Sequence, residues 1–504
     1  MKRLGALELI SLVVDADSFE RWDDVPLPPF GVHGFAEQSY LDELAEAREQ
    51  TGLDESVITG EALIGGRRVA IVMCEFAFLA GTIGVASAER LVLAAERATA
   101  EGLPLLATPA SGGTRMQEGT VAFLQMVKIS AAVAMHKAAG LPYLVYLRHP
   151  TTGGAFASFG SLGHVTAAEP HALIGLLGPR VYRAIHGAPL PEGVQTAENL
   201  AARGLVDAVV PPERLREVTI NILTVLAAAR ETPPPVPDLP FEPLMDVPTW
   251  DSILRSRRPE RPGVRQLLRA AANTVTVLQG TGAGEREPNL LLALVKFGDA
   301  PCVLLGQDRR HADRPLGPAG LREAQRGMRL AAQLRLPLVT VIDTAGAALG
   351  KEAEEGGLAG EIAHSLVELT TLRAPTICVL LGEGAGAGAL ALLPADRVLC
   401  AQHAWLAPLL PEGASAIKHR TVERAAEMAD SQGVRSLDLL KHHIVDRIVA
   451  EHPDAADEPA EFLARLGRVL EHELAILLRR SPEELLTSRL ARYRGLGLPG
   501  SAPT

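Results

Sequence analysis

The sequence predicts an α/β protein made of two successive domains that share one plan. The first observation is a construction that occurs twice, in which an apolar strand ends in small residues: LPLLATPASGGTR and later LPLVTVIDTAGAALG. We call such a strand end a glycine break. The second observation is spacing, because Gly113 follows Pro104 by nine positions and Gly346 follows Pro337 by nine. The third is a proline-rich stretch between the halves. These features predict one βαβ unit on each side of a boundary.

Each copy contains a second apolar run that also ends in small residues. Its opening proline, Pro142 or Pro375, lies 38 positions after the proline that opens the copy. The first of these runs ends at Gly153-Gly154-Ala155. The second ends, with an offset of one residue, at Ala387-Gly388-Ala389. The intervening sequence is long enough for a helix, so each copy is predicted to be a strand, a glycine break, a helix and another broken strand.

Length and composition place the boundary between the copies. A chain of 504 residues is too long for one ordinary hydrophobic core, so two domains of about 200–250 residues are expected. Proline is concentrated from Thr232 to Pro262, and such sequence disfavours regular structure. We therefore predict an N-terminal domain over residues 1–235, a linker over 236–262 and a C-terminal domain over 263–504.

Charge and cysteine usage argue against several classes of function. The net charge of −11 and the pI of about 5.8 disfavour nucleic acid as the main partner. The four cysteines form no C-x-x-C pair, so neither a zinc ribbon nor a disulfide framework is expected. Glu8 interrupts the apolar start and Glu383 the most apolar window, so we expect neither a signal peptide nor a membrane span. The expected location is the cytoplasm.

Small residues at a strand-to-helix junction suit one kind of chemistry. A backbone N–H reaches an oxyanion only where no side chain intervenes, and the helix that follows adds the positive end of its dipole. One amide from each of two glycine breaks can converge on one oxygen and stabilise the charge that develops there. A single glycine in such a place more often only forms a turn. Because the pair recurs at matched positions, the sequence predicts two oxyanion holes for two enolate-like oxygens.

Several ordered blocks resemble the two subunits of the bacterial acetyl-CoA carboxylase carboxyltransferase. Blocks similar to its β subunit include CEFAFLAGTIG, SGGTRMQEG, TTGGAFASF and AEPHALIGLLGPRV. Blocks similar to its α subunit include VIDTAGAALGKEAEEGG, LLGEGAGAGALAL, LLPEGASAI and SRLARYRGLG. The similarity covers residues 38–215 and 290–497. The chain therefore resembles a β–α fusion, of the kind also seen in propionyl-CoA carboxylase carboxyltransferases.

The resemblance implies a fold of two crotonase-like (ClpP/crotonase) ββα-superhelix domains in tandem, the first for acyl-CoA and the second for biotin. Carboxybiotin would release CO2, the biotin enolate would remove the α-proton of the thioester, and the thioester enolate would capture CO2. The residues predicted by position for the acyl-CoA enolate are Gly112, Gly113, Gly153 and Gly154. Those predicted for the ureido oxygen of biotin are Gly346, Gly388 and Ala389.

The resemblance also implies contacts with the acyl-CoA substrate. The residues predicted to make them are Ser111, Arg115, Gly154 and Ala155. Arg115 and Lys128 could meet CoA phosphates, although a solvated or structural role is commoner for single basic residues. No metal site is predicted. The family motif D-T-P-G-aromatic-x-P-G is altered here, because the segment from Asp343 to Gly350 lacks both prolines and the aromatic residue.

The implied activity is transfer of a carboxyl group from carboxybiotin to the α-carbon of a short acyl-CoA. Leu390 and Ala391 match the acetyl-type α subunit, which favours acetyl-CoA to malonyl-CoA. Such a reaction serves fatty acid biosynthesis or polyketide precursor supply. Two alternatives stay open: a malonyl-thioester decarboxylase, and an inactive scaffold subunit of a carboxylase complex.

The expected partners follow from what the sequence lacks and from the resemblance. The chain contains no biotin-attachment MKM sequence and no ATP-binding glycine-rich loop. The biotin carboxyl carrier protein and biotin carboxylase are therefore expected as separate chains. A homodimer or larger homo-oligomer is expected, in which each site is shared between the N-terminal domain of one chain and the C-terminal domain of another.

Overall fold

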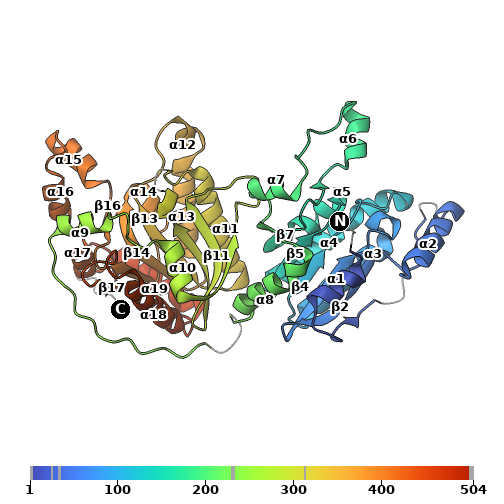
Figure 1. The fold of residues 1–504 in the computed structure, drawn as a ribbon, viewed down its shortest axis with the longest axis horizontal. Coiled ribbons are helices and arrows are strands. Elements are labelled where there is room, and N and C mark those ends of the chain that lie inside the picture. Colours follow the sequence, from blue (N-terminus) through green and yellow to red (C-terminus); the bar gives the residue numbers. More distant parts are fainter. Residues whose placement is uncertain (1–3, 24–26, 32–35, 229–232, 312–313, 499–504) are drawn as a thin grey trace. The chain divides into compact units, whose positions relative to one another are not determined.

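The computed structural model describes residues 4–23, 27–31, 36–228, 233–311 and 314–498, which form two compact units (Figure 1). Unit 1 comprises Met1–Leu223 together with Gly282–Gly284. Unit 2 comprises Thr224–Thr281 and Glu285–Thr504. Each unit has its own sheet with helices packed against it, so the mixed α/β class predicted from the sequence is confirmed.

The described residues of unit 1 form a seven-stranded sheet in the order β1-β2-β3-β4-β5-β7-β9. The first three strands are antiparallel, and β3 to β9 are parallel. A short parallel pair, β6 with β8, lies beside it. The bounds are β1 Glu20–Arg21, β2 Val57–Ile64, β3 Arg67–Cys74, β4 Leu105–Thr108, β5 Tyr143–Leu147, β6 Thr151–Thr152, β7 Val165–Ala168, β8 Ile174–Gly175 and β9 Ala208–Val209.

The helices of unit 1 connect these strands and cover the sheet. The long helices α3 and α4 lie side by side, and α6 projects from the body of the unit (Figure 1). The bounds are α1 Ala6–Val13, α2 Gln38–Thr51, α3 Val85–Ala100, α4 Gly119–Ala138, α5 Gly153–Phe156, α6 Pro179–His186, α7 Ala197–Ala202 and α8 Pro212–Ala228. Single turns of 3-10 helix are η1 Leu79–Gly81, η2 Met116–Glu118 and η3 Phe159–Ser161.

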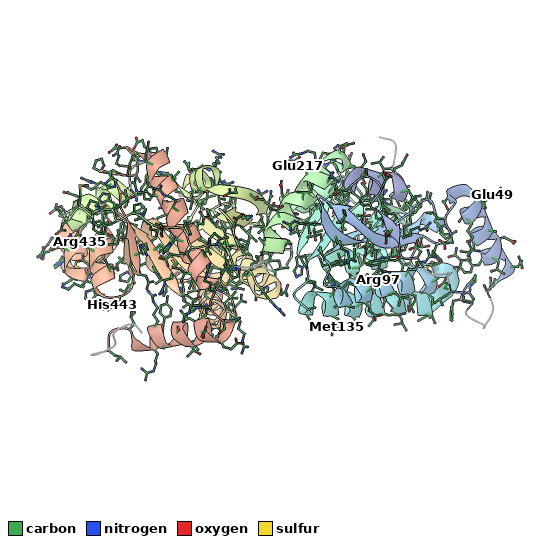
Figure 2. The ribbon with its side chains drawn as sticks, turned by 90° about the horizontal axis from the view of Figure 1, so that it is seen from below. Glu49, Arg97, Met135, Glu217, Arg435 and His443 are labelled. Atoms are coloured by element: carbon green, nitrogen blue, oxygen red, sulfur yellow. The ribbon has the colours of Figure 1, made fainter. Side chains whose placement is uncertain are left out.

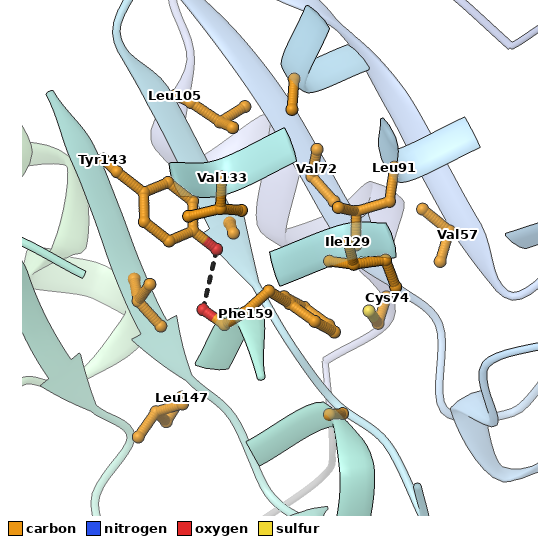
Figure 3. Packing of buried hydrophobic residues seen from close by; sticks show 14 of the residues in the cluster. Val57, Val72, Cys74, Leu91, Leu105, Ile129, Val133, Tyr143, Leu147 and Phe159 are labelled. Atoms are coloured by element: carbon orange, nitrogen blue, oxygen red, sulfur yellow. Dashed lines mark hydrogen bonds between the residues drawn. The ribbon is translucent and has the colours of Figure 1, made fainter. Parts of the chain in front are cut away.

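The core of unit 1 lies between the parallel strands and the inner faces of α3 and α4. The parallel strands β4 and β5 are buried along their whole length, as expected where helices cover a sheet. Figure 3 shows Val133 of α4 beside the ring of Tyr143 of β5, and Ile129 of α4 next to Leu91 and Cys74. The Tyr143 hydroxyl donates to the carbonyl of Phe159 at 2.8 Å. This hydrogen bond satisfies the polar group of the Tyr143 side chain inside an apolar cluster.

Helix α4 is unusual because its outer face is apolar as well. Among the described residues, Met116–Ala138 is the one helical segment long and apolar enough to cross a membrane, and 28% of its most apolar window is buried. Its inner face packs against α3, so the segment is part of the unit 1 fold. The outer face exposes large side chains, among them Met135 at 68% exposure, labelled at the edge of the unit in Figure 2.

The described residues of unit 2 form an eight-stranded sheet in the order β10-β11-β12-β13-β14-β15-β17, with β16 paired to β14. Strands β10 to β12 are antiparallel and the following pairs are parallel, as in unit 1. The bounds are β10 Ala272–Leu278, β11 Leu290–Phe297, β12 Ala300–Gln307, β13 Leu338–Thr344, β14 Thr376–Ala385, β15 Arg397–Ala401, β16 Trp405–Ala407 and β17 Arg447–Val449.

The helices of unit 2 follow the same plan, with additional helices at the C-terminal end. Helix α11 occupies the place that α3 has in unit 1. The bounds are α9 Thr249–Ser256, α10 Val264–Ala271, α11 Pro318–Leu334, α12 Lys351–Glu355, α13 Leu358–Thr371, α14 Gly386–Leu390, α15 Pro411–His419, α16 Ala425–Gln432, α17 Ser436–Lys441, α18 Pro459–Leu477 and α19 Pro482–Gly495, with the 3-10 turn η4 Arg309–His311.

The segment predicted as the domain linker belongs to unit 2. Residues 233–248 are extended, and carbonyl groups along them accept hydrogen bonds from unit 2 side chains, Pro234 from Arg479 at 2.6 Å and Met245 from Gln402 at 3.1 Å. Helix α9 then buries Ile253 in a cluster with Trp405. The prediction of a linker through residue 262 is therefore wrong for its second half, because apolar side chains there complete the unit 2 core. We call residues 233–248 the strap.

Strand pairing within each sheet shows which residues of unit 1 correspond to which residues of unit 2. Met73 pairs with Thr108 in unit 1, as Gly306 pairs with Val341 in unit 2. Helix α5 begins at Gly153 and helix α14 at Gly386, which follow Pro104 and Pro337 by the same number of positions. The one-residue offset inferred from the sequence is therefore wrong. It arose because Ala387-Gly388-Ala389 was matched to Gly153-Gly154-Ala155, one residue too far along the chain.

Candidate active site

The first glycine break of unit 1 is fixed by its own backbone and one hydroxyl. The N–H of Gly112 donates to the carbonyl of Ala80 at 2.8 Å, and the N–H of Gly113 donates to Oγ of Ser111 at 3.0 Å. The carbonyl of Gly113 accepts from the N–H of Ile83 at 2.8 Å. Gly113 has φ +111°, a conformation that L side chains rarely adopt, so glycine is required at this turn.

The second glycine break of unit 1 lies directly against the first. Gly153 has φ +63°, and its N–H donates to the carbonyl of Leu176 at 3.0 Å. A Cβ at Gly153 would lie 3.1 Å from Cα of Gly113, so the two glycine backbones meet face to face. Ser111 pairs with Thr151, which joins the two breaks through main-chain hydrogen bonds.

Two amides at this junction have no protein acceptor within the described ranges: the N–H groups of Thr114 and Gly154. Gly154 is in the first turn of α5, where an N–H has no intrahelical acceptor. A Cβ at Gly154 would lie 3.2 Å from Oγ1 of Thr114, so the two residues are neighbours. Of the four glycines predicted to donate here, only Gly154 keeps a free N–H, because Gly112, Gly113 and Gly153 donate within the protein.

Unit 2 repeats this geometry residue by residue. The N–H of Gly346 donates to Oγ1 of Thr344 at 3.1 Å, as Gly113 donates to Ser111, and Gly346 has φ +141°. Ala347 bridges to Leu316, as Thr114 bridges to Ile83. Gly346 was predicted to donate to biotin, but in the structure its N–H is engaged, and the following amide, of Ala347, has no acceptor among the described residues.

The second glycine break of unit 2 supplies the partner amide. Gly386 has φ +63°, identical to Gly153, and it opens α14. The first-turn N–H of Ala387 has no acceptor within the described chain and corresponds to that of Gly154. A Cβ at Gly388 would lie 2.9 Å from N of Ala347, so only glycine leaves that amide accessible. Ala389, predicted to contact biotin, is fully buried.

The amides that sequence reasoning missed are those of Thr114, Ala347 and Ala387. Each directly follows a glycine with a positive φ, namely Gly113, Gly346 and Gly386. At each of these turns, the N–H without an acceptor in the described part of the chain belongs to the residue directly after the glycine. The glycine is thus the visible signal in the sequence, and the donor is found one position later.

The expectation that Arg115 contacts a CoA phosphate is wrong. Its side chain is fully buried, and Nη1 donates to Oε2 of Glu55 at 2.8 Å. Nη2 donates to the carbonyl of Thr82 at 2.8 Å. Burial alone would raise the pKa of Glu55, but the hydrogen bonds and charge of Arg115 outweigh it, so this pKa lies below its usual value. The Arg115 side chain therefore fastens the segment after the first glycine break to Glu55, just before β2, and to Thr82, just after η1.

The other side chains predicted to meet the substrate are also internal or engaged. Ser111 is fully buried and its hydroxyl binds Gly113, and Ala155 is fully buried in the core. Lys128 is exposed and forms an ion pair with Glu89. Of the predicted contacts, only the backbone of Gly154 lies at the junction with a free donor. The structure thus offers main-chain donors here, not charged side chains.

A buried carboxylate lies directly before the first glycine break of unit 2. Oδ1 of Asp343 accepts from the N–H of Glu383 at 3.2 Å, and Oδ2 lies 3.4 Å from Nη1 of Arg309. Burial raises the pKa of Asp343, and the nearby charges of Arg309 and Arg261 offset this only in part. Across the described ranges no group of three or more His, Cys, Asp or Glu side chains is placed to bind a metal ion.

Each unit thus has, within its described residues, one pair of amides without a protein acceptor at a strand-to-helix junction of its parallel sheet. A pair of N–H donors of this kind is able to stabilise negative charge that develops on an oxygen atom. Comparison with known proteins gives the family. The model of the family described as "Carboxyl transferase domain" matches residues 31–482, and the chain belongs to this family.

Relatives in this family extend over the whole chain. The sequence is 60% identical over 502 residues to the probable biotin-dependent acyl-coenzyme A carboxylase beta3 subunit of Mycobacterium tuberculosis, covering 99% of this chain and 100% of the relative. It is 37% identical over 519 residues to the acetyl-coenzyme A carboxylase carboxyl transferase subunits beta/alpha of Salinispora tropica, covering 99% and 91%. These matches confirm the resemblance stated from the sequence.

Solved structures with the same fold are more distant in sequence. Transcarboxylase 12S, solved with methylmalonyl-coenzyme A and methylmalonic acid bound, superposes with a TM-score of 0.73 at 19% identity, covering 94% of this chain and 90% of that one. A single-chain, multi-domain long-chain acyl-CoA carboxylase superposes with a TM-score of 0.70 at 18% identity, covering 92% and 46%. At these identities the likeness concerns the fold alone.

Proposed function

We propose that this chain transfers a carboxyl group from carboxybiotin, carried on a separate protein, to the α-carbon of a short acyl-CoA. The favoured reaction converts acetyl-CoA to malonyl-CoA. One observation supports this above all others: the same pair of free amides occurs in both units, Thr114 with Gly154 and Ala347 with Ala387. Two enolate-like oxygens need two such pairs, whereas a reaction with one enolate needs only one.

The two units take different roles in this proposal. In unit 1, Thr114 and Gly154 donate to the thioester oxygen of the acyl-CoA and stabilise it as the α-proton leaves. In unit 2, Ala347 and Ala387 donate to the ureido oxygen of biotin, and Gly388 leaves room for that oxygen. Biotin would supply the carboxyl group and the base. The proposal therefore requires no protein base at the junction, in keeping with the apolar and main-chain groups found there.

The relatives support the acyl-CoA and biotin assignments. Their names describe biotin-dependent acyl-coenzyme A carboxylase and acetyl-coenzyme A carboxylase carboxyl transferase subunits. We propose the same cofactor here, with the biotin carrier and biotin carboxylase as separate chains in the cytoplasm. Each unit would have the crotonase-like fold. Leu390, 46% exposed in α14, matches the acetyl-type α subunit, and this match supports acetyl-CoA as the acyl substrate.

We further propose a homo-oligomer in which the two kinds of unit meet between chains. The supporting observation is a set of large apolar side chains exposed on α4, around β8 and on α6. Helix α6 buries none of its residues. The set comprises Phe123, Leu124, Val127, Met135, Leu176, Val181 and Ile185, each at least 49% exposed. Exposed apolar patches of this kind mark protein contacts. An enzyme that sediments as a monomer with full activity would contradict this assembly.

A panel of acyl-CoAs assayed with carboxybiotin tests the proposal directly. Acetyl-CoA is expected to gain a carboxylate fastest. Release of CO2 from malonyl-CoA without any biotin, together with no carboxyl transfer, would instead identify a malonyl-thioester decarboxylase.

A second variant separates a catalytic unit 2 from a scaffold. Gly388→Val places a side chain against the amide of Ala347 and should lower carboxyl transfer about a hundredfold or more. Unchanged transfer in the assembled complex would show that unit 2 is a scaffold. Gly360→Val serves as the control, because Gly360 is exposed on α13 and a Cβ added there would meet no atom within 4 Å.

A further inference from the structure

One side chain joins the two glycine breaks of unit 2. Gln307 is the last residue of β12 and is 3% exposed. Its Oε1 accepts from the N–H of Asp343 at 3.0 Å, at the end of β13. Its Nε2 donates to the carbonyl of Gly388 at 3.0 Å, in the first turn of α14. A single buried amide group therefore spans the two segments that carry the free N–H groups.

Unit 1 has no such bridge at the matching place. Strand register makes Cys74 the counterpart of Gln307, since Met73 pairs with Thr108 as Gly306 pairs with Val341. Cys74 is fully buried, and its thiol interacts with the backbone of Ala110, the counterpart of Asp343, but it is too short to reach a second backbone segment. Both units share the main-chain pairing between breaks, Ser111 with Thr151 and Thr344 with Gly384. The hydrogen bond from Gln307 to Gly388, which completes the bridge, is thus an addition in unit 2.

The loop of unit 2 needs an added restraint because its residues are small. The stretch from Ala345 to Ala348 contains only alanine and glycine, without the prolines that would limit its backbone freedom. Moving α14 away from the end of β13 would lengthen one of the two Gln307 hydrogen bonds, both of which are 3.0 Å long. Asp343 is fastened on its other side as well, because its carboxylate accepts from the N–H of Glu383 on β14.

We infer that Gln307 is a positioning residue that sets the separation between the amides of Ala347 and Ala387. The inference rests on the proposed function, in which these amides meet the ureido oxygen of biotin. Gln307 does not contact that oxygen itself. Its effect reaches the site through Gly388, whose carbonyl it binds and whose Cα lies against the amide of Ala347.

Two substitutions separate its hydrogen bonds from its shape. Gln307→Met keeps the length of the side chain and removes both hydrogen bonds. Gln307→Glu keeps an acceptor for Asp343 but sets a carboxylate oxygen against the carbonyl of Gly388. The matched control is Cys74→Ala, at the equivalent position of unit 1.

The first readout is amide hydrogen exchange in the full-length protein. Gln307→Met should speed exchange in peptides covering residues 343–348 and 386–390 by about tenfold, the factor expected for the loss of one buried hydrogen bond. Peptides covering 111–114 and 153–155 should not change. Cys74→Ala should leave the unit 2 peptides unchanged. Equal exchange in wild-type and Gln307→Met protein at 343–348 and 386–390 would overturn the inference.

The second readout is a split in kinetic constants. Both Gln307 variants should raise KM for biotin about tenfold, with Gln307→Glu the more severe, while KM for acyl-CoA stays at the wild-type value. An equal rise in both constants would indicate general damage and would overturn the positioning role. If the wild-type protein transfers no carboxyl group, the proposed function fails, and the exchange experiment still decides whether Gln307 joins the two breaks.

Discussion

The two units present the same pair of main-chain donors, but different side chains fix the loops that carry them. In unit 1 the charged pair Arg115–Glu55 lies fully buried behind the first glycine break. In unit 2 the neutral side chain of Gln307 spans both breaks. The backbone conformations are nevertheless matched, with φ +63° at both Gly153 and Gly386. The geometry of the donors is therefore the shared feature, and its support differs between the units.

The electrostatic cost of the two supports also differs. Arg115 has hydrogen-bond partners on both terminal nitrogens, so its charge and that of Glu55 are balanced. Asp343 and Arg309 lie 3.4 Å apart without a hydrogen bond between them. Asp343 has a raised pKa because it is buried, so it can take up a proton when its partner is lost. Loss of the arginine charge is consequently expected to lower the free energy of unfolding more in unit 1, where Arg115 is lost, than in unit 2, where Arg309 is lost.

The largest expected effect is that of Arg115→Met. It leaves Glu55 buried without its partner, which should destabilise unit 1 by about 3–5 kcal/mol. The free energy can be followed by urea-dependent hydrogen exchange of peptides from β3 and β4. Arg309→Met is the matched change in unit 2 and should cost less than half as much, because Asp343 can become neutral. Equal losses would remove the electrostatic distinction between the units.

The next largest effect is a dependence of stability on pH, and it arises from the sixth residue of helices α3 and α11, which occupy equivalent places in the two units. In α3 this residue is Arg90, paired with Asp54; in α11 it is Glu323, which is buried and accepts from the N–H groups of Gly280 and Glu287. Burial raises the pKa of Glu323 to about 7, although those two N–H groups oppose the shift.

The sign of the pH effect follows from proton uptake. Between pH 4.5 and about 7 the folded protein keeps a proton on Glu323 that the unfolded chain releases. As the pH rises through this range, the free energy of unfolding of unit 2 should therefore fall, and Glu323 should contribute up to about 3 kcal/mol of this loss. Glu323→Gln should flatten that slope in unfolding measured at a series of pH values. A variant with the wild-type slope would assign the pH dependence to other groups.

A smaller difference in stability is expected between alanine substitutions of Gly153 and Gly386, the glycines that begin α5 and α14. Gly153→Ala and Gly386→Ala place an L residue in the same left-handed conformation, which costs about 1–2 kcal/mol. The added Cβ at Gly153 would also lie 3.1 Å from Cα of Gly113, whereas at Gly386 the nearest atom is 3.5 Å away. Gly153→Ala should therefore lower the thermal midpoint more. The reverse order would contradict the close approach of the two breaks in unit 1.

The smallest effect tests the hydroxyl groups that accept from the break glycines. Ser111→Ala and Thr344→Ala each remove one acceptor, for the N–H of Gly113 and of Gly346 respectively. Each should cost about 1 kcal/mol, and Ser111→Ala slightly more because Ser111 is fully buried. Denaturant midpoints of the two variants give the comparison. Costs that differ by several kcal/mol would show that the two loops are not equivalent.

The duplicated plan could be predicted because it depends on local sequence. Apolar runs that end in glycine mark buried parallel strands, so the glycine breaks at Gly113 and Gly346 could be placed from the sequence. The equally long segments between the strands nevertheless differ, because unit 1 has one α-helix there, α4, and unit 2 has two, α12 and α13. The free donors were missed because a peptide plane belongs to two residues. Sequence reasoning named the glycine, while the N–H that is left free belongs to Thr114 or Ala347.

The supports could not be predicted because they join residues far apart in the chain. Arg115 lies 60 positions from Glu55, and Gln307 lies 81 positions from Gly388. Neither pair has a local signal, and a lone arginine beside a glycine-rich turn suggests a phosphate ligand as readily as an internal ion pair. The linker was misjudged for a similar reason, since Pro-rich sequence does not reveal that Ile253 completes a distant core.

The strap has a consequence for cutting the polypeptide in two. Any fragment of unit 2 that starts at residue 263 omits α9, leaving Trp405 without Ile253 and Gln402 without the carbonyl of Met245. A fragment that starts at residue 224 retains these contacts. Co-expression of two shorter proteins in place of this one is therefore expected to succeed only with the division upstream of the strap, so that the proline-rich segment travels with the C-terminal piece.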